Sequence, residues 1–118
     1  MFSKSIQNFL DKFNIKYDIE HRINFENGRC YIDFLLDKNV FIECYGDYWH
    51  CNPQKYDENY YHKKISKLAK EIWDDDNMRI LKLNKLGYKE IIVWELDWNK
   101  NKKFFENFKN KLIEYQII

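Results

Sequence analysis

Residues 30–50 carry the sequence CYIDFLLDKNVFIECYGDYWH, and this stretch decides how the chain is expected to fold. Two runs rich in β-branched and aromatic residues, 30–36 and 40–45, are separated by the turn sequence Asp37-Lys38-Asn39. Each run has one acid between large apolar neighbours, Asp33 in the first and Glu43 in the second. The pattern predicts two adjacent strands that each carry a carboxylate.

The flanking sequence predicts the rest of an α/β domain. Residues 17–25 alternate apolar and polar side chains and precede Asn27-Gly28, a pair typical of a tight hairpin turn, so three strands are expected in a meander. Helical periodicity marks residues 2–14 and 65–86, the latter as one helix or two joined near Asp74. Residues 91–94 form a short apolar strand, and Asn99 is expected to cap a last helix. The order αβββαβα predicts helices flanking a mixed sheet.

Length and composition limit the class of protein. The 118 residues suit a single domain over 1–118, with 45% hydrophobic and 19% aromatic residues and one proline, which excludes a disordered chain. Three cysteines without paired spacing signal neither disulfides nor a structural zinc site. No run approaches the roughly 20 apolar residues of a membrane span, and no signal peptide is evident, so a cytoplasmic location is expected. A net charge of +1 says little about partners.

Acids in central strands point to a cation. A buried carboxylate without a partner is unfavourable, so Asp33 and Glu43 need a cation or strong hydrogen bonds if they converge. Carboxylate oxygens suit Mg²⁺, which also keeps waters for a substrate phosphate. The alternative is that both acids face solvent from a half-exposed hairpin.

The segment after the second acid adds further reactive groups. Tyr45-Gly46-Asp47-Tyr48-Trp49-His50 leaves the same strand, and loops at strand ends often carry function. His50 can accept a proton from a water that attacks phosphorus, or it can be a structural histidine. Asp76 and Arg79 lie one helical turn apart and can pair at the same site, although Asp76 also belongs to an acidic run that solvent would accommodate.

Four segments together resemble a known family. IDFLL (32–36), IECYGDYWH (42–50), DNMRILKLNKLGY (76–88) and IIVWE (91–95) are similar to the very-short-patch mismatch repair endonucleases and their phage and intron-homing relatives. The resemblance covers residues 29–98. It implies a metal-dependent DNA endonuclease of the PD-(D/E)xK superfamily, with a restriction-endonuclease-like αβββαβα core.

The resemblance also implies roles for individual residues. Asp33 matches the essential metal-binding acid, and the backbone carbonyl of Cys44 matches a second metal ligand. His50 matches the histidine thought to act as general base. Glu43 takes the superfamily's second-acid position, and Asp47 and Asp76 match further acids of the homing relatives. The implied cofactor is Mg²⁺, with Mn²⁺ as a substitute.

Two departures from the family pattern matter. Tyr45 stands where the superfamily usually has its catalytic lysine, which leaves His50 to activate water. The zinc-binding set of the repair enzymes is incomplete, with Cys51 and His62 nearby, so a structural zinc is doubtful.

DNA is the expected partner. Basic residues at the start of the helix predicted over 65–86, together with Arg79 further along it, are candidates for phosphate contacts that are insensitive to sequence. They are His62, Lys63, Lys64, Lys67 and Lys70. A second lysine set near the end, Lys100, Lys102, Lys103, Lys109 and Lys111, can equally be solvated. Exposed aromatics within 45–49 or 56–61 can stack on bases, although core packing is the expected fate of Trp49.

Other functions remain open from sequence. A branched-DNA or junction nuclease uses the same core, and a catalytically inactive nuclease fold would serve as a DNA-binding module. At this length there is little room for a separate recognition domain. The chain is therefore expected to act as a homodimer, with a recognition partner, or as a low-specificity nickase.

Overall fold

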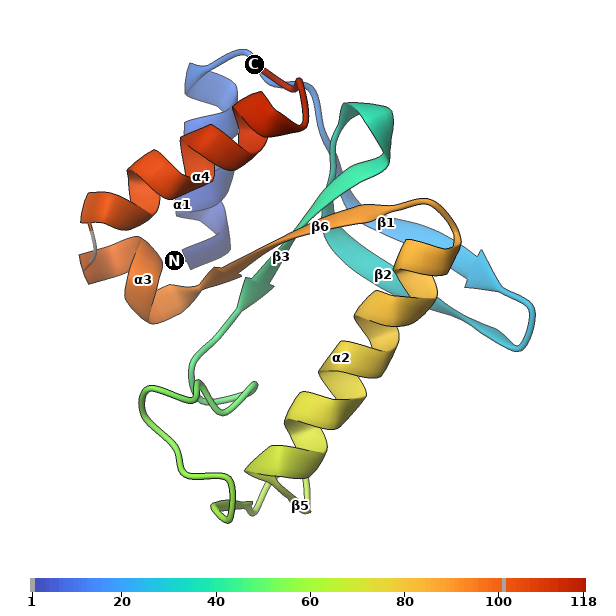
Figure 1. The fold of residues 1–118 in the computed structure, drawn as a ribbon, viewed down its shortest axis with the longest axis vertical. Coiled ribbons are helices and arrows are strands. Elements are labelled where there is room, and N and C mark those ends of the chain that lie inside the picture. The colour runs from blue at the N-terminus through green and yellow to red at the C-terminus, as the bar shows by residue number, and fades with distance from the viewer. Residues whose placement is uncertain (1, 101) are drawn as a thin grey trace.

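A computed structural model describes residues 2–100 and 102–118, and its elements follow the predicted order with additions (Figure 1). The helices are α1 (Phe2–Lys12), α2 (Ala69–Lys85), α3 (Glu95–Lys100) and α4 (Lys102–Glu114), with a 3-10 turn η1 (Asp37–Asn39). The strands are β1 (Asp18–Phe25), β2 (Gly28–Leu35), β3 (Val40–Tyr45), β4 (Tyr61–His62), β5 (Lys67–Leu68) and β6 (Lys89–Trp94). None of the described helices is both long and apolar enough to cross a membrane.

The main sheet is mixed, as predicted. Its strand order is β1-β2-β3-β6, in which β1, β2 and β3 form the antiparallel meander and β6 pairs parallel to β3. A parallel pair needs a crossover connection, and α2 lies within the segment that joins β3 to β6. This arrangement confirms the expected α/β class, with a mixed sheet and the αβββαβα order.

Helices cover both faces of the sheet (Figure 1). On one face, Leu10 of α1 and Phe108 of α4 share a core cluster with Ile42 of β3. On the other face, Leu83 of α2 packs with Phe41. Because successive side chains of a strand point to opposite faces, Phe41 and Ile42 each fill a different core, and both are fully buried. β3, which carries Glu43, is therefore a central strand covered on both sides.

The helix predicted over 65–86 begins later than expected. Ser66 has a φ of +61°, a left-handed conformation that interrupts a helix, and residues 61–68 form the small β4–β5 hairpin instead. α2 starts at Ala69, where the Glu71 side chain accepts a hydrogen bond from the Leu68 N–H at 3.0 Å. It continues through Asp74 as one helix. Lys63, Lys64 and Lys67 therefore precede α2.

Two other local predictions need correction. The first hairpin turns at Glu26 and Asn27, and of the expected pair only Gly28 has a positive φ, of +155°. Asn99 lies inside the short helix α3 and not at the start of the last helix, which is α4. α3 follows directly from β6 and brings the Leu96 N–H to the loop after β3.

Candidate active site

The backbone ladder between β2 and β3 gives way to side-chain hydrogen bonds at the two predicted acids. The described pairing of these strands ends at Phe34 and Ile42. Beyond it, Asp33 Oδ2 accepts a hydrogen bond from the Cys44 N–H at 2.7 Å. Glu43 Oε1 accepts one from the Asp33 N–H at 3.3 Å. These bonds hold the carboxylates of Asp33 and Glu43 beside each other where the strands separate.

Arg79 of α2 binds Glu43 with both terminal nitrogens. Its Nη1 lies 3.1 Å from Glu43 Oε2, and its Nη2 donates to Glu43 Oε1 at 3.2 Å. Nη2 also donates to the Tyr31 carbonyl. The guanidinium thus bridges β2, β3 and α2. Its partner is Glu43 and not Asp76, which corrects the pairing expected from their spacing on the helix.

Burial disfavours the ionised form of both acids. It raises the pKa of the Glu43 carboxyl to about 7, although the positive charge of Arg79 lowers it, and the nearby Asp33 raises it further. Burial also raises the pKa of Asp33, against the Cys44 N–H and the charge of Arg79, which lower it. One guanidinium therefore does not supply all the positive charge that two buried carboxylates require.

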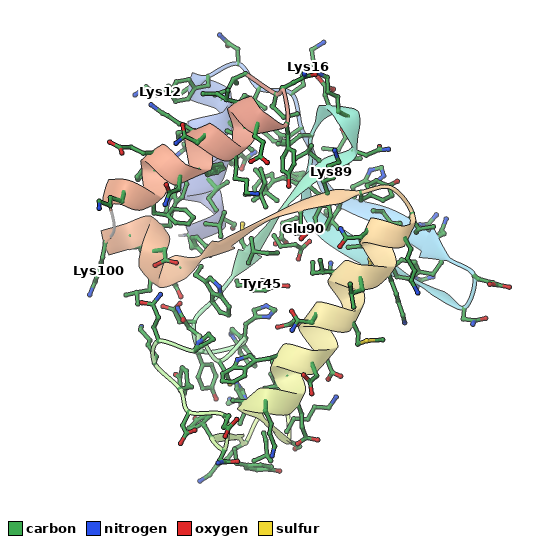
Figure 2. The ribbon with its side chains drawn as sticks, viewed as in Figure 1. Lys12, Lys16, Tyr45, Lys89, Glu90 and Lys100 are labelled. Atoms are coloured by element: carbon green, nitrogen blue, oxygen red, sulfur yellow. The ribbon has the colours of Figure 1, made fainter. Side chains whose placement is uncertain are left out.

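His50 lies in the loop after β3 and pairs with Asp76 of α2. Its Nδ1 is 2.8 Å from Asp76 Oδ2. An ionised carboxylate can only accept, so Nδ1 carries the hydrogen and Nε2 of the neutral ring is the acceptor. The ring stacks on Tyr45, with centroids 4.1 Å apart and planes 10° apart. Tyr45 lies at the end of β3 on the side of α2 (Figure 2).

Asp47 is placed away from this cluster of acids. It is buried and accepts hydrogen bonds from Asn52 Nδ2 at 2.8 Å and from the Leu96 N–H at 3.3 Å, and Lys55 Nζ lies 3.1 Å from its Oδ2. Burial opposes ionisation, but the hydrogen bonds from Asn52 and Lys55 prevail and lower the pKa of this carboxyl. Asp47 therefore anchors the loop after β3 to α3.

Glu20 is a site residue that the sequence did not indicate. It lies in β1 between Ile19 and His21, whose partners in β2 are Phe34 and Ile32, and so it stands opposite Asp33. Its φ of +49° is rare for a residue with a side chain. Glu20 and Asp33 line one cavity together, and the charge of Glu20 raises the pKa of Asp33. In the sequence, Glu20 was marked only as an acid within a predicted strand.

The donor set suits a hard cation with open positions. Two carboxylates and the Cys44 carbonyl, which lies on the side of β3 where the ladder has ended, are oxygen ligands of the kind Mg²⁺ accepts. Among residues 2–100 and 102–118, no group of three or more His, Cys, Asp or Glu side chains is placed to hold a metal ion by itself. Mg²⁺ is commonly held by one or two carboxylates with water and phosphate, so these residues fit it.

Cys51 and His62, the two residues that match the zinc set of the repair enzymes, are both fully buried. His62 Nδ1 accepts a hydrogen bond from the Ile65 N–H at 3.2 Å. Cys51 Sγ contacts the Tyr48 carbonyl at 3.9 Å. His62 Nε2 is buried and has no hydrogen-bond partner within residues 2–100 and 102–118.

The basic residues predicted to hold DNA separate into distinct places. Lys63 and Lys64 are exposed in the β4–β5 hairpin, and Lys70 is exposed in the first turn of α2. Lys67 pairs with Asp75. His62 is fully buried, so it cannot contact DNA, and Arg79 belongs to the acid cluster.

The second lysine set lies around α3 and α4. Lys100 ends α3 on the side of the molecule away from α2 (Figure 2). Lys109 lies over the Phe13 ring, and Lys111 lies near Tyr115 and Glu114. The side chain of Lys102 is outside the described residues.

Tyr48 and Trp49 are exposed beside His50. Their side chains are 38% and 54% exposed, and their rings meet edge to face with centroids 5.1 Å apart. The buried His62 ring lies against Tyr48 at 4.3 Å. Trp49 is therefore not a core residue, contrary to the expectation from sequence.

The mixed sheet with helices on both faces is also the fold of a solved nuclease catalytic domain. The chain is similar to the solved structure of the homing endonuclease I-Bth0305I catalytic domain, with 18% identity and a TM-score of 0.64. The match covers 97% of this chain and 95% of that one. At this identity the likeness shows the fold. Neither a protein-family model nor a curated protein matches the sequence.

Proposed function

We propose that this chain is a metal-dependent DNA endonuclease that hydrolyses phosphodiester bonds, of the very-short-patch-repair and homing type within the PD-(D/E)xK superfamily. The proposal rests on how four side chains are arranged. Asp33 and Glu43 are held together between separating strands, and the His50–Asp76 pair lies beside them. Similarity to a homing endonuclease catalytic domain supports the same function.

Asp33, Glu43 and the Cys44 carbonyl would hold Mg²⁺ or Mn²⁺. The bound ion would supply Lewis-acid stabilisation of the charge that develops on the phosphate. The fold buries these two carboxylates, and the charge of Arg79 does not fully offset the cost of ionising them. A bound cation would supply the missing positive charge. Arg79 keeps Glu43 in position and shares its negative charge.

His50 serves as the general base. Asp76 holds the ring with Nδ1 protonated, and Tyr45 stacks on its face, so that Nε2 remains able to accept a proton. As the water oxygen bonds to phosphorus, its proton passes to Nε2 and one ester oxygen leaves. Tyr45 cannot take this role, because burial raises the pKa of its phenol above the usual value.

DNA contacts come from two exposed surfaces. Lys63, Lys64 and Lys70 supply exposed positive charge around the β4–β5 hairpin, suited to phosphates. Tyr48 and Trp49 present aromatic surface next to His50, suited to stacking against bases. Neither surface specifies a target sequence.

Supercoiled, linear, mismatched and branched DNA, each incubated with Mg²⁺ or Mn²⁺, test the proposal. We expect nicking or cleavage that EDTA stops and that Asp33→Asn abolishes. The preferred substrate separates a mismatch or homing activity from a junction nuclease. Binding without cleavage of any substrate would instead identify an inactive DNA-binding module.

A further inference from the structure

A cavity of about 290 Å³ opens beside the His50–Asp76 pair, and the proposed chemistry does not use it. It lies between the carboxyl ends of β3 and β6, the loop after β3, and α2. Its lining residues are Tyr45, Pro53, Trp73, Asp76, Asn77 and Trp94. Aromatic rings come from two strands and a helix, so the cavity has flat apolar walls.

The aromatic walls are held in place before any ligand binds. The Trp73 indole N–H donates to the Cys51 carbonyl at 2.7 Å. Trp94 meets Tyr45 edge to face, with centroids 5.1 Å apart and planes at 78°. Tyr45 is also fixed by its stack on His50. A planar ligand would therefore meet surfaces that need little reordering.

Polar groups at the same cavity lack protein partners. Within residues 2–100 and 102–118, no hydrogen bond reaches the Asn77 side-chain amide, the Trp94 indole N–H or Asp76 Oδ1. None of the three is among the buried unpartnered atoms, so each is open to a ligand or to water. Together they offer donors and acceptors at the edge of an aromatic cavity.

We propose that this cavity binds a nucleobase that has left the base stack of the DNA substrate. A base is planar, so it can stack on Trp73 or Trp94, and its edge carries donors and acceptors for Asn77 and Asp76. An aliphatic ligand would leave these polar groups unpaired, and the Asp76 carboxylate would repel a phosphate. The inference rests on the proposed function, because Asp76 belongs to both the cavity and the His50 pair.

The shared Asp76 gives the cavity a place in substrate selection. Its Oδ2 holds His50 and its side chain also lines the cavity, so the seated base lies close to the phosphate that is attacked by the water His50 deprotonates. Unstacking is least costly for a mismatched or unpaired base. The cavity therefore favours cleavage beside a base that is already weakly paired.

Proton–nitrogen NMR on the full chain without Mg²⁺ tests binding independently of cleavage. The probes are dAMP, dCMP, dGMP and TMP, followed by a short single-stranded oligonucleotide. We expect saturable shifts of the Trp73 and Trp94 indole signals and of the Asn77 amide. The indole of Trp98, which is buried and donates to Ser5 Oγ, should stay fixed.

Variants assign the effect to the cavity. Trp94→Leu should weaken oligonucleotide binding about tenfold, the scale of one lost base-stacking contact. Asn77→Ala, at an exposed helical position, should weaken it without disturbing the fold, which the Trp98 signal reports. Asn110→Ala on α4 is exposed, lies outside the cavity and should bind like the wild type.

A parallel plasmid cleavage assay separates the two proposals. Cleavage together with unchanged Trp73 and Trp94 signals overturns the base-binding cavity and leaves the nuclease standing. Saturable shifts without cleavage under any metal overturn the nuclease and retain a nucleobase site. Neither shifts nor cleavage overturns both.

Discussion

At the scale of single residues, the side chain of Asp33 replaces a backbone acceptor. In an unbroken β2–β3 ladder, a backbone carbonyl of β2 would accept the same hydrogen bond. Its carboxylate accepts the Cys44 N–H, and burial raises its pKa. Asparagine would keep an acceptor oxygen but lose the charge. We therefore expect Asp33→Asn to abolish cleavage while the melting temperature of the metal-free protein holds or rises, as a plasmid assay and thermal unfolding would show.

Asp37→Asn is the matched control for that variant. Asp37 is an exposed acid in η1, a few residues along the same hairpin, so its substitution should leave both cleavage and stability close to those of the wild type. Cleavage by Asp33→Asn at the wild-type rate would eliminate the acid cluster as the metal site.

His50 is expected to act as the base in place of the missing lysine. His50→Ala should lower the single-turnover rate by about 10²- to 10⁴-fold, the usual scale of general base catalysis, with little change in DNA binding. His21→Ala, at another partly exposed histidine on β1, serves as control. A retained single-turnover rate in His50→Ala would exclude this role.

The sequence predicted the residues whose position in a strand decides their role, and it missed those whose role depends on distant partners. Asp33 and Glu43 were found because acids between large apolar neighbours in adjacent strands must face each other or solvent. Asp47 was an equally plausible site acid from sequence, but its partners are Asn52 in its own loop and Leu96 in α3. Glu20 reaches the site through strand register and a left-handed backbone conformation, which no local pattern indicated.

At the scale of elements, the separation of β2 and β3 is stabilised by a helix. Arg79 projects from α2 to Glu43 and to the carbonyl of Tyr31, so α2 closes the gap that the ladder leaves. The sequence predicted this helix but placed its start too early. Ile65 fits the helical spacing of apolar residues, but the left-handed backbone of Ser66 interrupts the helix there. α3 escaped prediction because it is six residues long.

The buried Glu43 makes the stability of the metal-free protein depend on pH. The pKa of Glu43 is about 7 in the folded state and its ordinary value is 4.5, so its stabilising contribution is complete below pH 4.5 and is lost as the pH rises through 7. Glu43→Gln removes that loss. Relative to wild type, the variant should gain about 3 kcal/mol between pH 4.5 and pH 8, measured by urea unfolding.

The comparison of the two proteins isolates Glu43, because other titrating groups are common to both. A gain that grows between pH 4.5 and pH 7 and then levels off agrees with burial of the ionised carboxylate. Wild type and Glu43→Gln with parallel stability curves across this range would show that Arg79 fully compensates the charge, contrary to the raised pKa.

At the scale of the whole molecule, the reactive groups gather where four segments meet. β2 and β3 supply the carboxylates, the loop after β3 supplies His50, and α2 supplies Asp76 and Arg79. β3 is covered on both faces, so these groups are attached to a strand that is almost wholly buried. The exposed hairpin lysines and the aromatic pair Tyr48 and Trp49 lie on the more open parts around it.

Metal binding should therefore stabilise the fold as a whole. Separated in an unfolded chain, Asp33 and Glu43 would bind Mg²⁺ weakly, whereas the folded site holds them together. An ion at ten times its dissociation constant then adds about 1.4 kcal/mol, and several degrees, to the stability of the wild type. The response should be larger at pH 8 than at pH 6, since the ion must displace the proton that Glu43 retains at the lower pH.

Differential scanning fluorimetry with Mg²⁺ or Mn²⁺ measures this response, and Asp33→Asn should lose it while Asp37→Asn keeps it. EDTA should return the wild type to the melting temperature of the metal-free protein and stop cleavage without unfolding the chain, because two hydrophobic cores hold the sheet and helices together. Unfolding by EDTA would reveal a structural metal instead. In that case the buried Cys51 and His62 would be the first residues to substitute, with Asp33→Asn as the reference that separates the two sites.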